Sequence, residues 1–348
     1  MKLYSSLCKC GLVFVDQIPF RICKELTVIY VLSNDLVMRT VSGDFRMHPG
    51  DIEIINVLEP VELIAPEKPA EVLFFSFDKA WLDTIDFNFE SVTYNCNICN
   101  FFSAQADRGS VGRLKQMMLQ ICDRMTQEED YDAVKSDVEE FLGYIRQNFD
   151  DVAHLFSTES KQESKKRVQM LSEYMIEHVS DKISLDDLSR VVYVSKQYLS
   201  KLFSNKLGKN YQDVINYYRV INAVIQLLET DNTLTYIAET SGFSSVNYYN
   251  KVFKTYLHCL PSKFRSMYKN AEQGVRFAEI TEEQLGQYLE LDAREFLTKE
   301  YSFRRQMSGG SDRLSLCIGD EPIEIPVSDG DLVEVIVRVR SNDQKSRN

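Results

Sequence analysis

The sequence predicts an α+β multidomain protein with four parts: a small antiparallel β-barrel or sandwich, a helical hairpin, an all-α domain and a small α/β extension. Three observations predict this class. Short runs of β-branched and aromatic residues, separated by turn signals, occur in residues 1–108. Apolar residues recur at helical spacing in residues 109–156 and 167–269. Strand-like runs return at residues 314–318 and 332–339 of the segment 270–348, after a helix expected over residues 281–297. A chain of 348 residues has the length of two or three domains.

The first part is predicted to be built from short strands. The runs with the strongest strand character are residues 12–15, 26–32, 51–55 and 72–77. Turn signals such as Gly43-Asp44 and Pro49-Gly50 separate these runs. Several short strands at this spacing favour an antiparallel barrel or sandwich.

Metal and cofactor chemistry is not expected in this part. His48 is the only one of the four histidines within residues 1–108, so a three-histidine metal site cannot form there. The pairs Cys96/Cys99 and Cys8/Cys10 lack the matched partners of a zinc site. The eight cysteines are scattered along the chain, which indicates reduced thiols in the cytoplasm. We predict no metal, no cofactor and no catalytic residues.

Two amphipathic helices are predicted in residues 109–156. Their apolar positions recur every three or four residues, and they are Leu114, Met117, Met118, Ile121, Val134, Val138, Phe141, Leu142 and Ile145. Two interpretations stay open with equal weight. The apolar faces pack against the strands, form a seam between two copies of the chain, or do both, and the seam predicts a homodimer.

The charge distribution separates the middle of the chain from its flanks. The chain carries a net charge of −12, but residues 161–269 carry +6 while residues 1–160 and 270–348 carry −12 and −6. A basic segment between acidic flanks indicates that this segment meets an anion. No apolar run approaches the ~18 residues of a membrane span. The first residues lack a secretory signal, so the expected location is the cytoplasm.

Residues 167–269 are predicted to be helical throughout. The preceding segment 157–166 has no apolar residue and is expected to be an exposed linker or the start of a helix. Helices are expected around residues 168–175, from Ser184, from Ser195 to Gly208, and over residues 211–228, 233–240, 244–256 and 261–268.

This helical segment contains an approximate internal repeat. Residues 185–189 correspond to 234–238 at an offset of 49, and residues 198–203 correspond to 248–253 at an offset of 50. The difference predicts a turn that is one residue longer in the second copy. Each copy is a short helix, a tight turn and a second helix. The apolar stripes that dock the second helices are Leu199, Leu202 and Phe203 in one copy, and Tyr249, Val252 and Phe253 in the other.

The opposite faces of these second helices carry short polar and cationic side chains. Such groups near a helix N-terminus suit hydrogen bonding to base edges and phosphates in a major groove. The candidate DNA-contacting residues are Ser195, Lys196, Gln197, Ser200, Lys201, Ser244, Ser245, Asn247, Tyr248, Asn250 and Lys251. The amides of Gln197 and Asn247 fit adenine, whereas the amines of Lys201 and Lys251 fit phosphates.

Residues 167–268, which contain this repeat, resemble the DNA-binding domain of the AraC/XylS family of bacterial transcription regulators. The matching stretches are ISLDDLSRVVYVSKQYLSKLF, YYRVINAVIQLL, IAETSGFSSVNYYNKVFK and PSKFR. The resemblance implies seven helices that hold two helix-turn-helix units on a linker helix, residues 211–228. Their recognition helices would enter successive major grooves about 34 Å apart. His258 and Ser189 stand where the family usually has glycine and alanine. The glycine departure is expected to strain the turn after the recognition helix.

The resemblance extends more weakly to the first part of the chain. The fragment MHPGDIEIIN, residues 47–56, is similar to the turn and strand of a cupin-like barrel. Family members often carry such a barrel, followed by helices that dimerise. The 79 residues from 270 onward lie outside the pattern and are too few for a glycosidase barrel of ~250 residues.

The expected function is that of a sequence-specific DNA-binding transcription regulator, acting as an activator and controlled by a small molecule in the barrel. The alternatives are a ligand-independent regulator controlled by a protein partner or by dimerisation, and the regulatory part of a carbohydrate-active fusion. The expected partners are double-stranded DNA, a second copy of the chain, a small-molecule effector and RNA polymerase, with no membrane. An enzyme is not expected.

Overall fold

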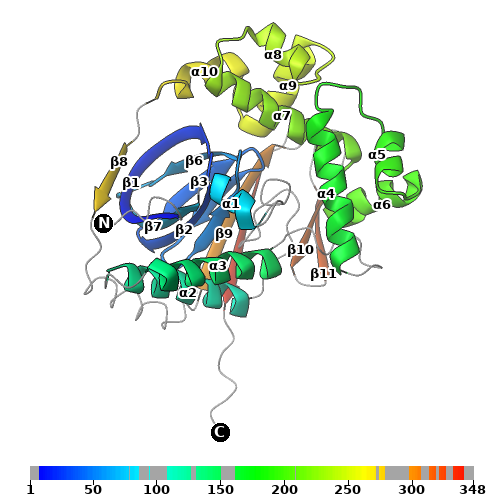
Figure 1. Ribbon diagram of the computed structural model, residues 1–348. Coiled ribbons are helices and arrows are strands. Elements are labelled where there is room, and N and C mark those ends of the chain that lie inside the picture. The colour runs from blue at the N-terminus through cyan, green and yellow to red at the C-terminus, as the bar shows by residue number, and fades with distance from the viewer. Residues whose placement is uncertain are drawn as a thin grey trace.

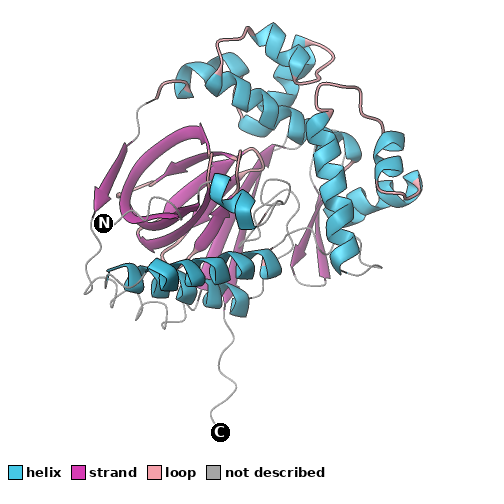
Figure 2. Cartoon of the chain, in the orientation of Figure 1, coloured by secondary structure: helices cyan, strands magenta, loops and turns pink. Residues whose placement is uncertain are grey.

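The computed structural model describes residues 8–77, 79–85, 94, 108–126, 131–149, 161–207, 209–271, 274–278, 298–306, 313–318, 321–326 and 332–340. A β-barrel lies at the centre, with a helical hairpin along one side and a helical region above it (Figure 1). Strands and helices occupy separate parts of the molecule (Figure 2), which confirms the predicted α+β class.

Seven antiparallel strands form the barrel, in the order β4-β3-β6-β1-β7-β2-β5. The strands are β1 (Cys8–Ile22), β2 (Leu26–Ser33), β3 (Leu36–Thr40), β4 (Asp44–Met47), β5 (Ile52–Ile55), β6 (Pro60–Ile64) and β7 (Ala70–Phe77). The four predicted runs lie in β1, β2, β5 and β7. The short strands β3, β4 and β6 were not predicted, because each has only four or five residues and mixes polar with apolar ones.

Successive side chains of the central strands alternate between two cores, because a strand points them to opposite faces. The barrel core is the cluster of interior side chains contributed by all seven strands: Val13, Val15, Cys23, Ile29, Val31, Leu36, Met38, Phe45, Met47, Ile55, Val61, Leu63, Ala70 and Val72. The alternate residues, such as Leu12, Val28 and Leu73, face outward into a second cluster shared with the hairpin. Both faces of these strands are therefore buried.

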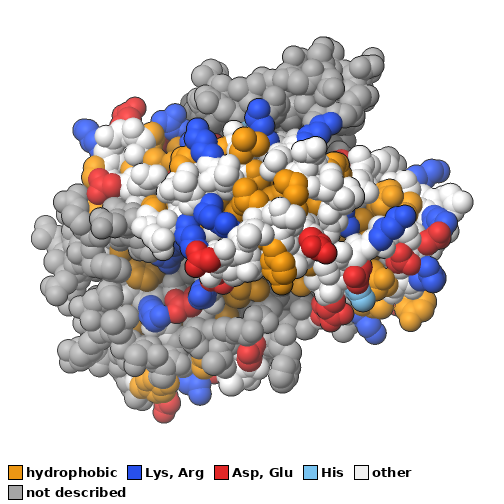
Figure 3. All heavy atoms as spheres, turned by 90° about the horizontal axis from the view of Figure 1, so that it is seen from above, with side chains coloured by type: hydrophobic (Ala, Val, Ile, Leu, Met, Phe, Trp, Pro, Cys, Tyr) orange, Lys and Arg blue, Asp and Glu red, His pale blue; other side chains and the backbone are white. Residues whose placement is uncertain are grey.

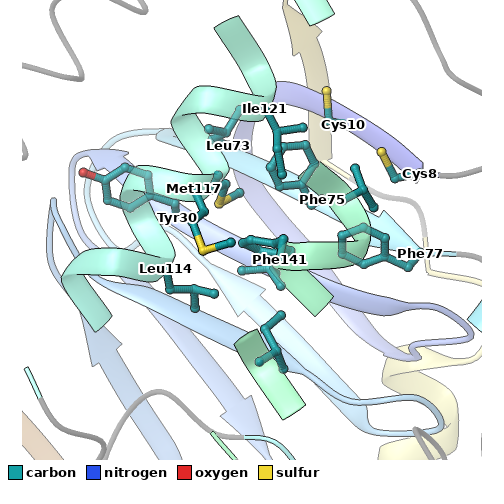
Figure 4. Close-up of a cluster of buried hydrophobic side chains, with 14 of the residues drawn as sticks. Cys8, Cys10, Tyr30, Leu73, Phe75, Phe77, Leu114, Met117, Ile121 and Phe141 are labelled. Atoms are coloured by element: carbon teal, nitrogen blue, oxygen red, sulfur yellow. The ribbon is translucent and has the colours of Figure 1, made fainter. Parts of the chain in front are cut away.

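The hairpin consists of α2 (Arg108–Thr126) and α3 (Tyr131–Asn148), and it covers the outer face of the central strands. Figure 4 shows Leu114, Met117 and Ile121 of α2 and Phe141 of α3 among strand side chains. The ring of Phe141 lies 5.9 Å from the ring of Phe75. A short helix, α1 (Lys79–Ile85), places Trp81 against the same cluster.

All nine apolar hairpin positions singled out in the sequence are buried within the chain: Leu114, Met117, Met118, Ile121, Val134, Val138, Phe141, Leu142 and Ile145. Packing against the strands accounts for the burial of these side chains. A seam between two copies of the chain does not account for it. The physical reason is that the central strands expose an apolar outer face that needs a cover. Self-association of the hairpin would have to use its polar outer face, so the homodimer stays a prediction.

Strands of the C-terminal extension return to the barrel. Strand β8 (Gly274–Ala278) pairs with residues 12–17 of β1. Strand β6 pairs with the later residues of β1, from Gln17 to Ile22. Strand β9 (Thr298–Gln306) pairs with β12 (Leu332–Arg340) and runs beside β4, and β10 (Arg313–Ile318) pairs with β11 (Glu321–Pro326). The strands expected at 314–318 and 332–339 are present. The helix expected over 281–297 lies outside the described residues.

The helical region contains seven helices between residues 161 and 268. They are α4 (Lys161–Glu177), α5 (Leu185–Val191), α6 (Lys196–Leu207), α7 (Tyr211–Glu229), α8 (Leu234–Thr240), α9 (Val246–Leu257) and α10 (Pro261–Tyr268). Residues 161–166 of the expected linker are thus the first turns of α4, whereas residues 157–160 lie outside the described ones. None of the described helices is both long and apolar enough to cross a bilayer.

Helix α7 joins the two halves of this region by giving one patch of side chains to each. Val214 and Ile215, in its first half, are buried with α4, α5 and α6. Val220, Val224 and Leu227, in its second half, are buried with α8, α9 and α10. Both halves therefore pack on the same helix.

The barrel docks on the second half through the far end of β1. Phe20, Ile22 and Val41 belong to the same apolar cluster as the second half of α7. The ring of Phe20 lies 5.2 Å from the rings of both Phe264 and Tyr268 in α10. The Tyr268 hydroxyl donates to Oε2 of Glu62 at 3.2 Å, and that carboxylate is almost fully buried.

The turn between α8 and α9 depends on a glycine. Gly242 has a φ of +78°, and a Cβ atom there would lie 2.2 Å from the carbonyl oxygen of Val179 and 2.8 Å from Nε of Arg219. Arg219 cannot withdraw freely, because its Nη2 donates to the carbonyl of Asp181 at 2.8 Å and its Nε donates to that of Val179 at 3.3 Å. Only a residue without a side chain fits this conformation and this space.

We expect Leu114→Glu to unfold the barrel and hairpin rather than yield a folded monomer. Leu114 is fully buried, so the substitution places a carboxylate without a partner in an apolar cluster. The cost is at least about 3 kcal/mol. Gln116→Glu, on the exposed face of the same helix, is the control and is expected to change stability by less than about 0.5 kcal/mol. Thermal unfolding by circular dichroism measures both, and a folded L114E protein of half the wild-type mass in sedimentation would contradict the packing.

Gly242→Ala is expected to destabilise the helical region by more than about 2 kcal/mol, because the new methyl group meets backbone at a positive φ. Gly112→Ala is the matched control. Gly112 lies within α2 with nothing near its Cβ position, so the change is expected to stabilise by about 0.5–1 kcal/mol. Denaturant unfolding of the two variants checks the pair. Equal effects would mean that the contact with Val179 does not constrain the turn.

Candidate nucleic-acid interface

The first repeat is a capped helix, a turn and a second helix. Ser184 caps α5: its hydroxyl accepts the backbone N–H of Asp187 at 3.2 Å, and the Asp187 carboxylate accepts the N–H of Ser184 at 2.9 Å. The hydrogen bonds from Ser184 lower the pKa of Asp187. Leu199 and Phe203 of α6 are buried against α5 and α7, which leaves the other face of α6 toward solvent.

The second repeat is built in the same way. Thr233 caps α8 by accepting the N–H of Tyr236 at 3.2 Å. Ser245 caps α9 by accepting the N–H of Tyr248 at 3.2 Å. Tyr249 and Phe253 of α9 are fully buried, and their rings contact one another at 5.6 Å.

The predicted difference in turn length is present. Helices α5 and α8 are related by 49 residues at both ends, and α6 and α9 by 50. The intervening turns are residues 192–195 in the first unit and 241–245 in the second. Corresponding backbone hydrogen bonds close both turns: Val194 donates to Ser189 at 3.0 Å, and Phe243 donates to Ala238 at 2.9 Å.

Most of the predicted DNA-contacting residues lie on the exposed faces of the second helices or just before them. The exposed ones are Ser195, Lys196, Gln197, Ser200, Lys201, Ser244, Ser245, Asn247 and Lys251, and Asn250 is partly exposed. The amides of Gln197 and Asn247 occupy the second position of α6 and of α9. Their contacts with DNA stay predictions.

Four of these residues have partners within the chain. The Tyr248 hydroxyl accepts a hydrogen bond from Nδ2 of Asn216 in α7 at 3.0 Å, so Tyr248 braces α9 against α7. Ser195 and Ser245 use their hydroxyls to accept backbone N–H groups at the starts of α6 and α9. Lys196 forms an ion pair with Asp186. Gln197, Ser200, Lys201, Asn247 and Lys251 remain the best placed for a ligand.

The two departures from the family pattern have identifiable local roles. His258 follows α9 with a φ of 55° and a ψ of 11°, the left-handed conformation that favours glycine, so the strain expected at this turn is present. Ser189 is buried, and its hydroxyl donates to the carbonyl of Asp186 at 2.9 Å within α5. Both residues are accommodated without a change in the helices.

Sequence reasoning missed a row of polar side chains along α7. Asn216 reaches Tyr248, Arg219 reaches the carbonyls after α4, and Gln226 reaches the hydroxyl of Ser241 at 3.3 Å. Burial lowers the pKa of Arg219. The signal was present in the sequence, since Asp213, Asn216, Arg219 and Asn222 recur every three residues in an otherwise apolar helix. This row fixes α9, the turn after α8 and the chain that follows α4 against α7.

The surface of the helical region is favourable for an anion. Residues 251–269 contain five Lys or Arg residues and no Asp or Glu. Figure 3 shows the molecule from above, where Lys and Arg side chains lie among hydrophobic ones and Asp and Glu side chains are also present. Among the residues that the structure describes, no three His, Cys, Asp or Glu side chains are arranged to hold a metal ion.

Comparisons with known proteins agree with this arrangement. The family profile described as "Helix-turn-helix domain" matches residues 188–267. An uncharacterized HTH-type transcriptional regulator of Staphylococcus aureus strain MSSA476 is 35% identical over 99 residues, 28% of this chain and 13% of that protein. Regulatory protein PocR of Salmonella typhimurium strain LT2 is 34% identical over 92 residues, 26% of this chain and 30% of PocR. The chain thus matches less than a third of the length of either relative.

A solved structure of ToxT from Vibrio cholerae O395 aligns with 77% of this chain and 100% of its own, at 12% sequence identity and a TM-score of 0.43. The family profile, in contrast, matches only residues 188–267, which include most of the doubled repeat. The family match identifies residues 188–267 as a helix-turn-helix domain, which agrees with the resemblance of residues 167–268 to the DNA-binding domain of the AraC/XylS family.

Proposed function

We propose that the chain is a sequence-specific, DNA-binding transcription regulator that acts in the cytoplasm. The observation that carries the proposal is the pair of capped helix-turn-helix units on one helix, each presenting an exposed polar face. Such a face at the start of a recognition helix is what a major groove accepts. The helical segment is also the basic part of an otherwise acidic chain, as binding to phosphates requires.

The two recognition helices, α6 and α9, have the same kinds of ligand group in equivalent places. Each offers an amide at its second position, Gln197 or Asn247, and a lysine four residues later, Lys201 or Lys251. The amide is the group that reads adenine, and the lysine is the group that positions a helix on phosphates. We propose that the two units read two parts of one site.

The barrel is proposed to be the regulatory part of the chain. Apolar side chains from all seven strands meet in the barrel core, so an effector in this described part would have to displace them. This packing favours the alternative in which the barrel responds to a protein partner or to a second copy of the chain. The docking of Phe20 on Phe264 and Tyr268 is the route by which the barrel would act on the helical region. Activation through RNA polymerase belongs to the same proposal, and transcription in vitro from a bound promoter tests it.

Gln197→Ala and Asn247→Ala are each expected to relax the base preference at one position of the site. The loss against the preferred sequence is about 1–3 kcal/mol, because each change removes a bidentate contact to a base edge. The measurement is selection from a random duplex pool by the full chain, followed by titration of the selected duplex and of single-base variants. Equal losses on selected and unrelated duplexes would show that these amides do not read bases.

Lys201→Ala and Lys251→Ala are expected to weaken binding to all duplexes to a similar extent. Each removes one phosphate contact, so the slope of log K against log salt should fall by about 0.9. Titrations over a range of salt concentrations give this slope. Lys68→Ala, in the barrel between β6 and β7, is the matched control and should leave affinity and slope unchanged. A DNA affinity that does not depend on salt would contradict the proposed function.

A further inference from the structure

The turn of the first unit holds a tyrosine in an unfavourable setting. Tyr193 has a φ of 55°, in the left-handed region that bulky side chains rarely adopt. Its side chain is also 83% exposed, the highest value among the exposed large hydrophobic residues in the described part of the chain. A large ring in water on a strained backbone contributes nothing to the fold.

The second unit shows that the turn needs the backbone conformation and not the tyrosine. Gly242 occupies the equivalent position with a φ of +78°. The N–H of Tyr193 donates to the carbonyl of Arg190 at 3.3 Å, and the N–H of Gly242 donates to the equivalent carbonyl of Glu239 at 2.9 Å. The second turn requires glycine because Val179 lies against it, whereas the first turn leaves its side chain in solvent. Glycine would therefore serve the first turn equally well.

The position of Tyr193 indicates what covers its ring. It lies two residues before Ser195, where the exposed polar face of α6 begins, and the exposed cations Arg190 and Lys196 lie on either side of it in the chain. In a docked helix-turn-helix unit the first helix crosses the sugar-phosphate backbone while the start of the second enters the groove. The turn between them consequently faces that backbone.

We propose that Tyr193 is a contact to the DNA backbone, in which its hydroxyl donates to a phosphate oxygen and its ring packs against the adjoining deoxyribose. This rests on the proposed DNA binding of the two units. The contact anchors the first unit only, since Gly242 has no side chain to offer. It adds affinity without reading sequence, as contacts to phosphate and sugar do.

The test compares the full chain with Tyr193→Gly, Tyr193→Asn and Tyr193→Phe on a duplex selected by the wild type and on an unrelated duplex of the same length. Glycine and asparagine both accept the left-handed conformation, so each variant keeps the turn. Both are expected to bind either duplex about tenfold more weakly, and phenylalanine about threefold, because it lacks only the hydroxyl. The salt slope should not change, since the phenol carries no charge. Tyr131→Asn, at an exposed tyrosine that begins α3 in the hairpin, is the control and should keep wild-type affinity.

Thermal unfolding of the same variants separates a ligand contact from a structural role. Tyr193→Gly or Tyr193→Asn should melt no lower than the wild type while binding DNA more weakly. Wild-type DNA affinity in both variants would overturn the proposal. Variants that bind DNA normally but lose transcription only when RNA polymerase is present would also overturn it. If the wild type binds no duplex, the proposed function itself is overturned. If the wild type binds and these variants bind equally well, only the Tyr193 contact is overturned.

Discussion

The helical region depends on one helix, because α7 contributes buried side chains to both apolar cores. Each helix-turn-helix unit has two helices of 7 and 12 residues, too few to bury a core between them. Val214 and Ile215 complete the first unit, and Val220, Val224 and Leu227 complete the second. Each unit consequently packs on α7, and the separation of the two units is set by the length of α7 between the two patches.

The polar side chains of α7 turn this shared core into a fixed geometry. A hydrophobic patch alone permits small rotations, whereas the bonds from Asn216 to Tyr248 and from Arg219 to two carbonyls allow one arrangement. Arg219 is the strictest of these, because its guanidinium is buried and must keep its acceptors. The chain that follows α4 and the turn after α8 meet at this side chain. Two recognition helices held in this way can demand a defined spacing of their contacts on DNA.

Sequence patterns predicted the parts of the fold that depend on local periodicity and repeat. The one-residue difference between offsets of 49 and 50 placed the longer turn in the second unit, since an insertion shifts the register of all that follows. The hairpin residues were recognised as buried, but periodicity does not tell which partner buries them, so Leu114 fitted a dimer seam as well as a core. Strand β8 was not predicted, because five residues that pair with a strand more than 250 positions away leave no local signal. Among the site residues, Gln197 and Asn247 lie as expected, whereas Tyr248 is held by a distant Asn216.

The coupling of barrel and DNA-binding region follows from the length of β1. This strand has 15 residues, and different stretches of it face three separate cores: the barrel core through Val13, the hairpin cluster through Leu12 and the second unit through Phe20. A strand shared by three cores cannot shift in one of them without disturbing the others, because packed interiors resist small displacements. Strand β8, which follows α10 after a few residues, pairs with the same strand. The second unit is therefore tied to β1 by packing on one side and by the chain on the other. A partner that moved β1 would reach α9 and α10 before it reached α6, so regulation through the barrel would act first on the second half of the DNA site.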